Sequence, residues 1–197
     1  MPSKLRLRYI FRPLVKGIAK ILNRLGLKNP NVATLMMLSF SVLSILFITI
    51  FENLFIFGIL VFLCGIFDGV DGALARLNDR ASKRGGFLDS TMDRVSEFVI
   101  FFGLLTYCWN RVLWNLIDMK LIVLISFIAS VMISYSRARA ETIFMGDYDI
   151  GLMARSERLF YLVVTSIIAF FIGFFNEFLF LYMWLVVGTY IFRAAHI

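Results

Sequence analysis

The sequence is poor in charge, proline, cysteine and histidine, and each shortage removes a class of protein. Only 17% of the 197 residues are charged and 60% are hydrophobic, with a mean hydropathy of +0.86. Soluble domains carry about 25% charged residues, so a soluble or disordered chain is excluded. Two cysteines cannot build a disulfide scaffold, and one histidine leaves no zinc cluster or Ser-His arrangement. Three prolines and 22 phenylalanines favour long apolar helices, and hence an integral membrane protein.

Six apolar segments of about 20 residues each are long enough to cross a bilayer as helices. They cover residues 32–51, 54–75, 87–109, 112–136, 157–175 and 178–197. Cys64 and Cys108 fall inside them and are expected to pack as small hydrophobic residues. The predicted fold is all-α, with six transmembrane helices in a membrane domain of residues 29–197.

Acidic residues are missing from the first 30 positions, which hold eight lysines and arginines. Apolar residues recur between these charges at helical spacing. Segment 1–28 is therefore predicted to be a basic amphipathic helix on anionic lipid headgroups. A solvated basic arm is the alternative, and nucleic acid is not an expected partner. No apolar stretch with a cleavage site follows the charges, so the segment is not a signal peptide.

The distribution of positive charge predicts the orientation. Eighteen of the 20 lysines and arginines fall on one side of the predicted spans, and only Arg111 and Lys120 fall on the other. The positive-inside rule then places both termini in the cytoplasm, which agrees with an even number of spans because such a chain returns to the side on which it began. Tyr107, Trp109 and Trp114 cluster at the opposite interface, where aromatic residues are common.

Four aspartates stand at the edge of the predicted membrane region. Asp68 and Asp71 lie on one face of the second span, and Asp89 and Asp93 lie one helical turn apart in the third. A short connection folds the third span back beside the second, so the four carboxylates converge near the cytoplasmic surface. Ionisable groups at membrane depth indicate function by default.

Two interpretations of this cluster compete. Four close carboxylates repel one another, and one or two divalent cations with oxygen preference, Mg²⁺, Mn²⁺ or Ca²⁺, would relieve the repulsion. The alternative is a salt-bridge network with Arg76, Arg80 and Arg94. The glycines Gly65, Gly69 and Gly72 leave a bare helix face that admits a flat ligand, and the Gly65/Gly69 pair can also be a helix-packing face; the two interpretations are compatible.

The spacing of these residues is similar to a known signature. The pattern Asp68-x2-Asp71-Gly72-x2-Ala75-Arg76-x8-Gly85-x3-Asp89-x3-Asp93 resembles, without a departure, that of the CDP-alcohol phosphatidyltransferase family. The segment Asn29–Thr34, NPNVAT, looks like the family's entry to its first span. Six spans and an N-terminal surface helix fit the family fold, so the resemblance covers nearly the whole chain.

The resemblance implies an enzyme that displaces CMP from a CDP-linked lipid, CDP-diacylglycerol or CDP-archaeol, with the hydroxyl of a second alcohol. It implies a pair of divalent ions, Mg²⁺ or Mn²⁺, and commonly a homodimer. The implied metal ligands are Asp68, Asp71, Asp89 and Asp93, with Asp93 also the general base. The implied CDP-binding residues are Asn31, Thr34, Gly72, Ala75, Arg76 and Gly85.

The second half of the chain points to the acceptor. The segments SYSRARAE at 134–141 and GLMARSERL at 151–159 resemble elements of phosphatidylinositol-phosphate and archaetidylinositol-phosphate synthases. They differ in Arg137, where lysine is common, and in Ser156, where proline is common. The resemblance implies that Arg137, Arg155 and Arg193 hold the phosphate of inositol phosphate. Arginines at helix ends can also be plain orientation charges, and Arg139 and Arg158 are interpreted in that way.

Other functions remain open from the sequence. A relative that accepts glycerol 3-phosphate or serine, or that uses a CDP-inositol donor, would share the four aspartates. An ion transporter would carry acids along the depth of the membrane, whereas here they gather at one edge.

Overall fold

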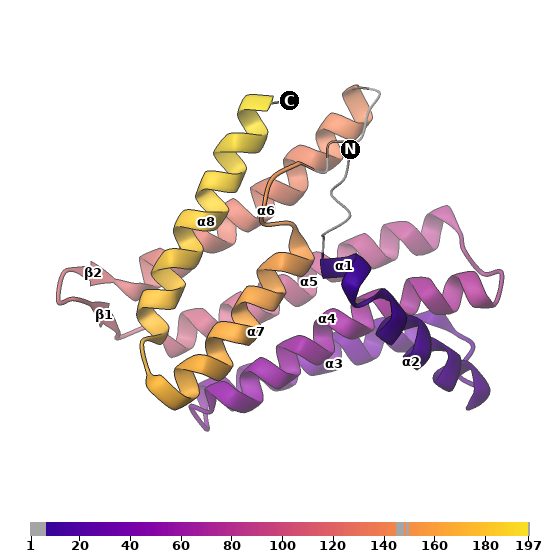
Figure 1. Ribbon diagram of the computed structural model, residues 1–197, viewed down its shortest axis with the longest axis horizontal. Coiled ribbons are helices and arrows are strands. Elements are labelled where there is room, and N and C mark those ends of the chain that lie inside the picture. Colours follow the sequence, from indigo (N-terminus) through magenta and orange to yellow (C-terminus); the bar gives the residue numbers. More distant parts are fainter. Residues whose placement is uncertain (1–6, 145–147, 149, 197) are drawn as a thin grey trace.

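The computed structural model describes residues 7–144, 148 and 150–196 and is almost entirely helical (Figure 1). Asparagine or serine side chains cap three of the helices, since Asn29, Asn53 and Ser82 accept hydrogen bonds from the first-turn amides. The long helices are α3 (Pro30–Thr49), α4 (Leu54–Leu77), α5 (Lys83–Tyr107), α6 (Met119–Ile143), α7 (Arg155–Ile172) and α8 (Phe175–His196).

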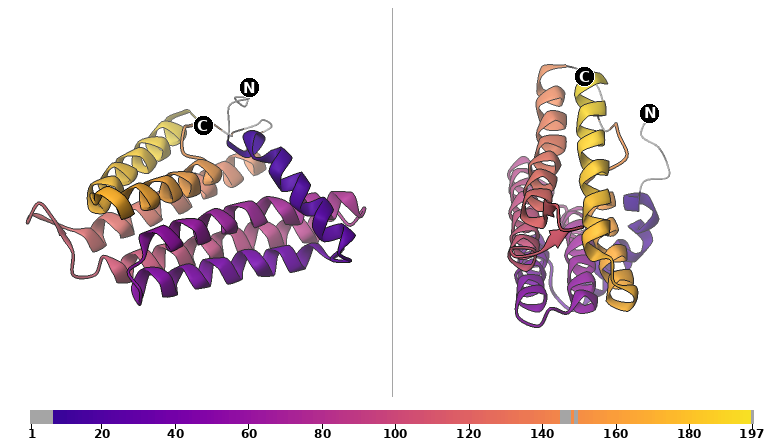
Figure 2. Two further views of the ribbon diagram at one scale, coloured as in Figure 1. Left: turned by 60° about the horizontal axis from the view of Figure 1, so that its bottom comes forward. Right: turned by 90° about the vertical axis from the view of Figure 1, so that its left-hand side faces the viewer.

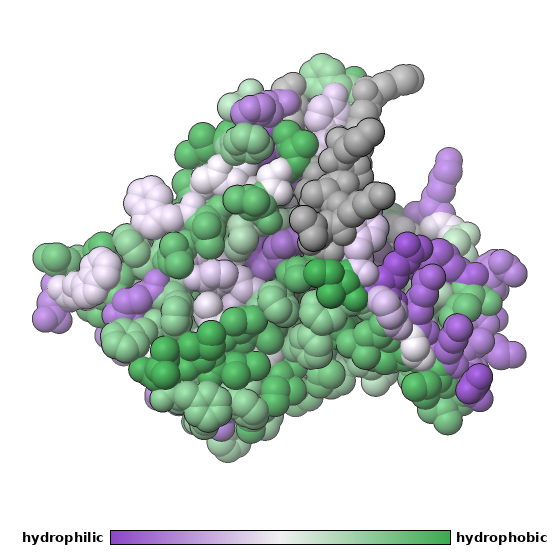
Figure 3. Space-filling model, in the orientation of Figure 1, coloured by the Kyte–Doolittle hydropathy of each residue, from purple (hydrophilic) through white to green (hydrophobic). Residues whose placement is uncertain are grey.

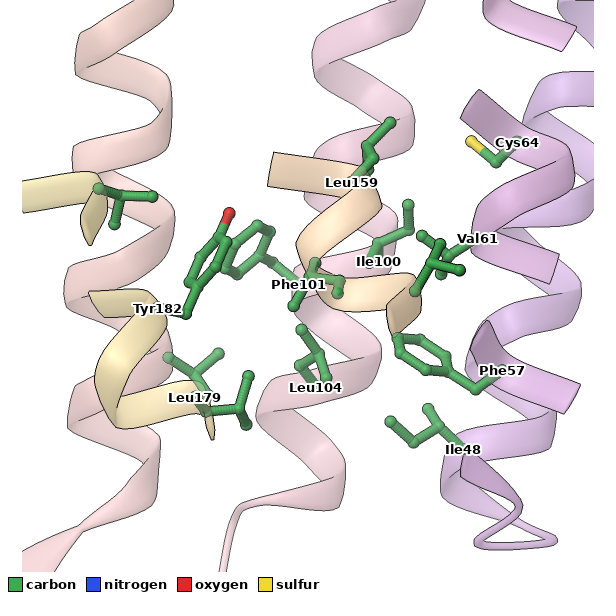
Figure 4. Packing of buried hydrophobic residues seen from close by; sticks show 14 of the residues in the cluster. Ile48, Phe57, Val61, Cys64, Ile100, Phe101, Leu104, Leu159, Leu179 and Tyr182 are labelled. Carbon is green, nitrogen blue, oxygen red and sulfur yellow. The ribbon is translucent and has the colours of Figure 1, made fainter. Parts of the chain in front are cut away.

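The long helices pack in two connected groups (Figure 2). Helix α3 lies against α4 and α5, α7 packs on α4, and α6 packs along α8 while it also contacts α5. The buried core between them is apolar and aromatic, with Phe57 of α4, Leu104 of α5 and Tyr182 of α8 fully buried (Figure 4). Cys64 and Cys108 are also fully buried, which confirms that they pack as hydrophobic residues.

The N-terminal segment is two short helices rather than one. Helix α1 (Leu7–Ile10) ends before Phe11, and α2 (Arg12–Arg24) begins with Pro13 in its first turn, where proline is tolerated because its missing N–H has no partner there. Residues 1–6 of the predicted surface helix lie outside the described residues. The apolar residues Ile10, Leu14, Ile21 and Leu25 stay exposed, as a helix on a bilayer surface requires.

Glycines on α4 let two other helices approach closely. A Cβ atom at Gly69 would lie 3.2 Å from a methyl group of Val15 on α2, and one at Gly65 would lie 3.6 Å from Leu159 on α7. The Gly65/Gly69 pair is therefore a packing face, as one of the two interpretations predicted. Hydrophilic residues gather at the end of the molecule that holds α2 and the α4–α5 turn (Figure 3).

A small hairpin corrects the predicted start of the fourth span. Strands β1 (Val112–Leu113) and β2 (Ile117–Asp118) pair antiparallel, and α6 begins only at Met119, not at 112. The turn residues Trp114 and Asn115 both have positive φ, which matches the right-handed twist of a two-stranded ribbon. The apolar run that continues through the hairpin concealed this turn from a hydropathy argument.

Four of the described helices, α3, α4, α6 and α8, are long and apolar enough to cross a membrane. The protein is thus an integral membrane protein, with the β1–β2 hairpin at one end and the α4–α5 turn at the other (Figure 1). Helices α5 and α7 carry more charged residues, and several of these side chains point inward to the site described next.

Candidate active site

Three carboxylates from two helices meet near the α4–α5 turn. Asp68 of α4 and Asp89 and Asp93 of α5 can place one oxygen each within 4.8 Å of the others. The turn at residues 78–82 reverses the chain between the two helices, and Ser82 Oγ accepts from the Gly85 amide at 3.0 Å to start α5. The sequence prediction that the α4 and α5 aspartates converge is confirmed for these three.

The donor set fits a divalent cation. Oxygens bound to one such ion at 2.0–2.6 Å lie at most roughly 5 Å apart, and the three oxygens here lie within 4.8 Å of one another. The Oδ1 atom of Asp89 is buried without a hydrogen-bond donor within the described part of the chain, whereas Asp93 Oδ1 lies 2.7 Å from Arg155 Nη1. Buried carboxylate oxygens without partners are costly, and a hard cation satisfies them. All-carboxylate donors suit Mg²⁺ or Mn²⁺.

Asp71 lies beside this group rather than within it. It is 3% exposed, and its Oδ2 accepts a hydrogen bond from Thr34 Oγ1 at 3.0 Å. The Thr34 hydroxyl, from the first turn of α3, therefore fixes the orientation of the Asp71 carboxylate. The structure holds the fourth predicted metal ligand one helical turn along α4, at the wall of a neighbouring cavity.

That cavity has a volume of about 200 Å³ and lies between the start of α3, the end of α4 and the start of α5. Asp71 and Asp89 form part of its wall, so it opens onto the carboxylate cluster. Small residues keep it open: a Cβ atom at Gly72 would lie 3.3 Å from the Arg76 guanidinium. All six predicted CDP-binding residues line it, namely Asn31, Thr34, Gly72, Ala75, Arg76 and Gly85.

Sequence reasoning missed other residues of this wall. Arg80 and Ser82 also line the cavity, from the turn between the two signature helices. The sequence contained a signal for them. The short turn at 78–82 joins the two helices that carry the predicted site residues, so the turn itself must lie close to the site.

Arg155 is the arginine that meets the carboxylates. Its Nη1 pairs with Asp68 and lies 2.7 Å from Asp93 Oδ1, and its Nη2 donates to Ser96 Oγ at 2.9 Å. One side chain of α7 thus joins α4 to α5. Among the described residues no ion pair joins the four aspartates to Arg76, Arg80 or Arg94, and Arg94 donates to the Ser90 carbonyl instead. The alternative salt-bridge network therefore named the wrong arginines.

The other two arginines of the predicted acceptor pocket have different contacts. Arg137 pairs with Glu141 one turn along α6, at 2.8 Å. Arg193 is 1% exposed and donates to the carbonyls of Ile133, at 2.6 Å, and Ile150. Arg193 therefore ties α8 to α6 and to the segment that precedes α7.

Arg158 is not an exposed orientation charge, as the sequence suggested. It is 1% exposed and pairs with the equally buried Glu97 of α5. The sequence spacing carried a signal, because Arg158 lies one turn beyond Arg155 and Glu97 one turn beyond Asp93.

The family model for CDP-alcohol phosphatidyltransferases matches residues 27–194. Curated relatives include the archaetidylinositol phosphate synthase of Pyrococcus horikoshii, 35% identical over 85% of this chain and 82% of the relative. The phosphatidylinositol phosphate synthase of Mycobacteroides abscessus is 34% identical over 84% of this chain and 73% of the relative.

Solved structures give the same result. The phosphatidylinositol phosphate synthase of Mycobacterium tuberculosis with CDP-DAG bound has a TM-score of 0.75 and 30% identity, and covers 93% of this chain and 91% of that one. The same enzyme in complex with manganese and citrate also gives a TM-score of 0.75 and 30% identity, with 92% of this chain and 86% of that one covered.

Proposed function

This chain belongs to the CDP-alcohol phosphatidyltransferase family, and we propose that it transfers the phospho-alcohol group of a CDP-linked lipid to inositol phosphate, releasing CMP. The reaction belongs to phospholipid biosynthesis, and the enzyme is a phosphotransferase. One observation carries the proposal: a cavity lined by every predicted nucleotide-binding residue opens onto a cluster of three carboxylates. The donor lipid is CDP-diacylglycerol or CDP-archaeol.

The carboxylates would hold divalent metal, and we assign two Mg²⁺ or Mn²⁺ ions to Asp68, Asp71, Asp89 and Asp93. Metal there would neutralise negative charge on the diphosphate while the bond between the lipid-linked phosphorus and the CMP oxygen breaks. The cavity residues hold the nucleotide, and Arg76 supplies a guanidinium that can bind phosphate in a bidentate manner.

Asp93 is assigned as the general base. In the transfer, the acceptor hydroxyl oxygen forms a bond to the lipid-linked phosphorus, the bond from that phosphorus to the CMP oxygen breaks, and the hydroxyl proton passes to Asp93. Asp93 Oδ1 lies 2.7 Å from Nη1 of Arg155, the arginine assigned to the acceptor, so a base at this position would be next to the bound acceptor, which supports the assignment.

We place the site at the cytoplasmic face of a six-span protein with both termini in the cytoplasm. The excess of lysine and arginine at the α4–α5 end supports this orientation. Residues 1–28 form the surface segment and residues 29–197 the catalytic domain. In this arrangement α5 and α7 also cross the membrane, with their charged residues turned inward, and two copies form a homodimer.

The first experiment identifies the acceptor. Purified enzyme is incubated with CDP-lipid in four parallel reactions. Each reaction contains one radiolabelled acceptor: inositol phosphate, inositol, serine or glycerol 3-phosphate. Of the four acceptors, we expect only inositol phosphate to give a phosphorylated lipid product and CMP, because Arg155, which can bind a phosphate, lies 2.7 Å from Asp93. Efficient use of an acceptor without a phosphate would contradict the assignment.

The arginines give a second prediction. We assign Arg137, Arg155 and Arg193 to the acceptor phosphate, where each charge-assisted hydrogen bond contributes about 1.5–3 kcal/mol. Arg155→Ala should raise the KM for inositol phosphate by about tenfold or more and change the KM for CDP-lipid little. Steady-state kinetics with both substrates varied measures this.

Arg139→Ala is the control for Arg155→Ala, since it also removes an arginine, but an exposed one, near the C-terminal end of α6 and two residues after Arg137. It should leave both KM values near those of the unmodified enzyme. If Arg155→Ala changes only the KM for CDP-lipid, then Arg155 is a nucleotide contact and the acceptor assignment is wrong.

A further inference from the structure

Two charged residues buried below the carboxylates have no task in the transfer as described. Glu97 of α5 is 2% exposed and Arg158 of α7 is 1% exposed. Arg158 Nε donates to Glu97 Oε1 at 2.9 Å, and Nη2 donates to Oε2 at 3.0 Å. Two parallel hydrogen bonds of this kind fix both the distance and the relative rotation of the groups they join.

The remaining donors of Arg158 are also engaged. Nη1 donates to the Met153 carbonyl at 3.1 Å, and Nη2 lies 3.3 Å from Ser134 Oγ on α6. A single guanidinium therefore joins α5, α6 and the segment that leads into α7. Arg193 holds the same segment from α8 through the Ile150 carbonyl.

The buried pair lies directly beneath the contacts of the site. Asp93 and Glu97 are one turn apart on α5, and Arg155 and Arg158 are one turn apart on α7. Residues at these spacings share a helix face, so the Asp93–Arg155 contact and the Glu97–Arg158 contact are successive links between the same two helices. The position of the lower link determines where the upper one falls.

We propose that the Glu97–Arg158 pair is the positioning element of this site: it fixes α7 against α5 so that Arg155 presents its guanidinium to the acceptor. The proposal rests on the proposed function, because it takes Arg155 as an acceptor-binding residue. Stability alone does not require the charges, since well-packed apolar side chains of similar volume often replace a buried ion pair without loss. Apolar contacts, however, do not fix the relative rotation of two helices as directional bidentate hydrogen bonds do.

The test separates positioning from stability. A single Arg158→Met exchange leaves Glu97 buried and unpaired and should destabilise the fold. The paired variant Glu97→Leu with Arg158→Met should restore thermal stability in nanodiscs to near that of the unmodified enzyme. It should nevertheless raise the KM for inositol phosphate by about tenfold or more, because a small displacement of a binding group is costly. The KM for CDP-lipid should stay within about twofold of the original, since no residue of α7 lines the nucleotide cavity.

The matched control applies the same exchanges to the ion pair at the opposite end of the molecule. Glu52→Leu with Arg111→Met removes a pair that is 3.1 Å apart and solvent-exposed, and it should leave both KM values unchanged. A stable Glu97→Leu/Arg158→Met enzyme with an unchanged acceptor KM would overturn the proposal, as would a parallel rise in both KM values.

A second variant covers the case in which the paired exchange does not fold. Glu97→Gln keeps the side-chain volume and one oxygen acceptor but sets an amide NH2 opposite an Arg158 donor. One of the two hydrogen bonds and the carboxylate charge are lost, so the acceptor KM should rise by about fivefold. An unchanged acceptor KM in Glu97→Gln also rejects the positioning role. Failure of the unmodified enzyme to use inositol phosphate would instead reject the proposed function, so the two failures are distinguishable.

Discussion

Asp89→Asn is expected to abolish transfer, together with the binding of divalent metal. Asparagine keeps the volume of the side chain but removes the charge from one member of a three-carboxylate group. Metal stabilisation of a breaking diphosphate is worth several kcal/mol, and each 1.4 kcal/mol is tenfold in rate, so turnover should fall by at least about 10³-fold. Asp68→Asn and Asp71→Asn should have the same result.

The measurement combines rate and metal binding. Turnover of CDP-lipid should vanish in excess EDTA and return when Mg²⁺ or Mn²⁺ is added back, and titration with Mn²⁺ should show weakened binding in Asp89→Asn. Asp118→Asn is the control, because this aspartate pairs with Lys120 at the other end of the molecule. Full turnover in excess EDTA would show that the carboxylates serve another purpose.

Asp93→Asn is expected to behave differently. If Asp93 is chiefly the base, kcat should fall by about 10²–10⁴-fold, the usual range for loss of general-base catalysis. Metal and CDP-lipid should still bind, because Asp68 and Asp89 remain and the nucleotide cavity does not include Asp93. Calorimetry of both ligands, beside single-turnover kinetics, measures the two effects separately.

A neighbouring variant tests whether the effect passes through Arg155. Asp93 pairs with Arg155, so its loss could act by reorienting that guanidinium. Ser96→Ala removes another partner of Arg155, held at 2.9 Å, without touching a carboxylate, and should lower kcat by less than about tenfold. If Asp93→Asn binds neither metal nor CDP-lipid, a separate base role is wrong and Asp93 is a metal ligand alone.

Residue spacing predicts the helix face on which Asp71 lies, but not the side chain that orients it. Helical periodicity correctly placed Asp68 and Asp71 on one side of α4, because three residues are almost one turn. It could not predict that the Thr34 hydroxyl, 37 residues away in the chain, donates a hydrogen bond to Asp71 and fixes the orientation of its carboxylate. The side-chain partner across a helix interface depends on how the helices cross, and the spacing within one helix does not contain that information.

The sequence by itself determined the class of protein, the family and six of the residues that line the cavity beside the carboxylates. The class follows from composition, while the family and the six cavity residues follow from the resemblance carried by the Asp68–Asp93 pattern and the Asn29–Thr34 segment. Only the tertiary structure decided the partners of the arginines. Arg155 reaches Asp68 across 87 positions of sequence, and Arg158 reaches Glu97 across 61. An arginine at a helix end has the same sequence pattern whether it faces water or a buried carboxylate. The difference arises when α7 packs beside α4 and its arginines reach α5, because burial then makes each charge depend on a partner.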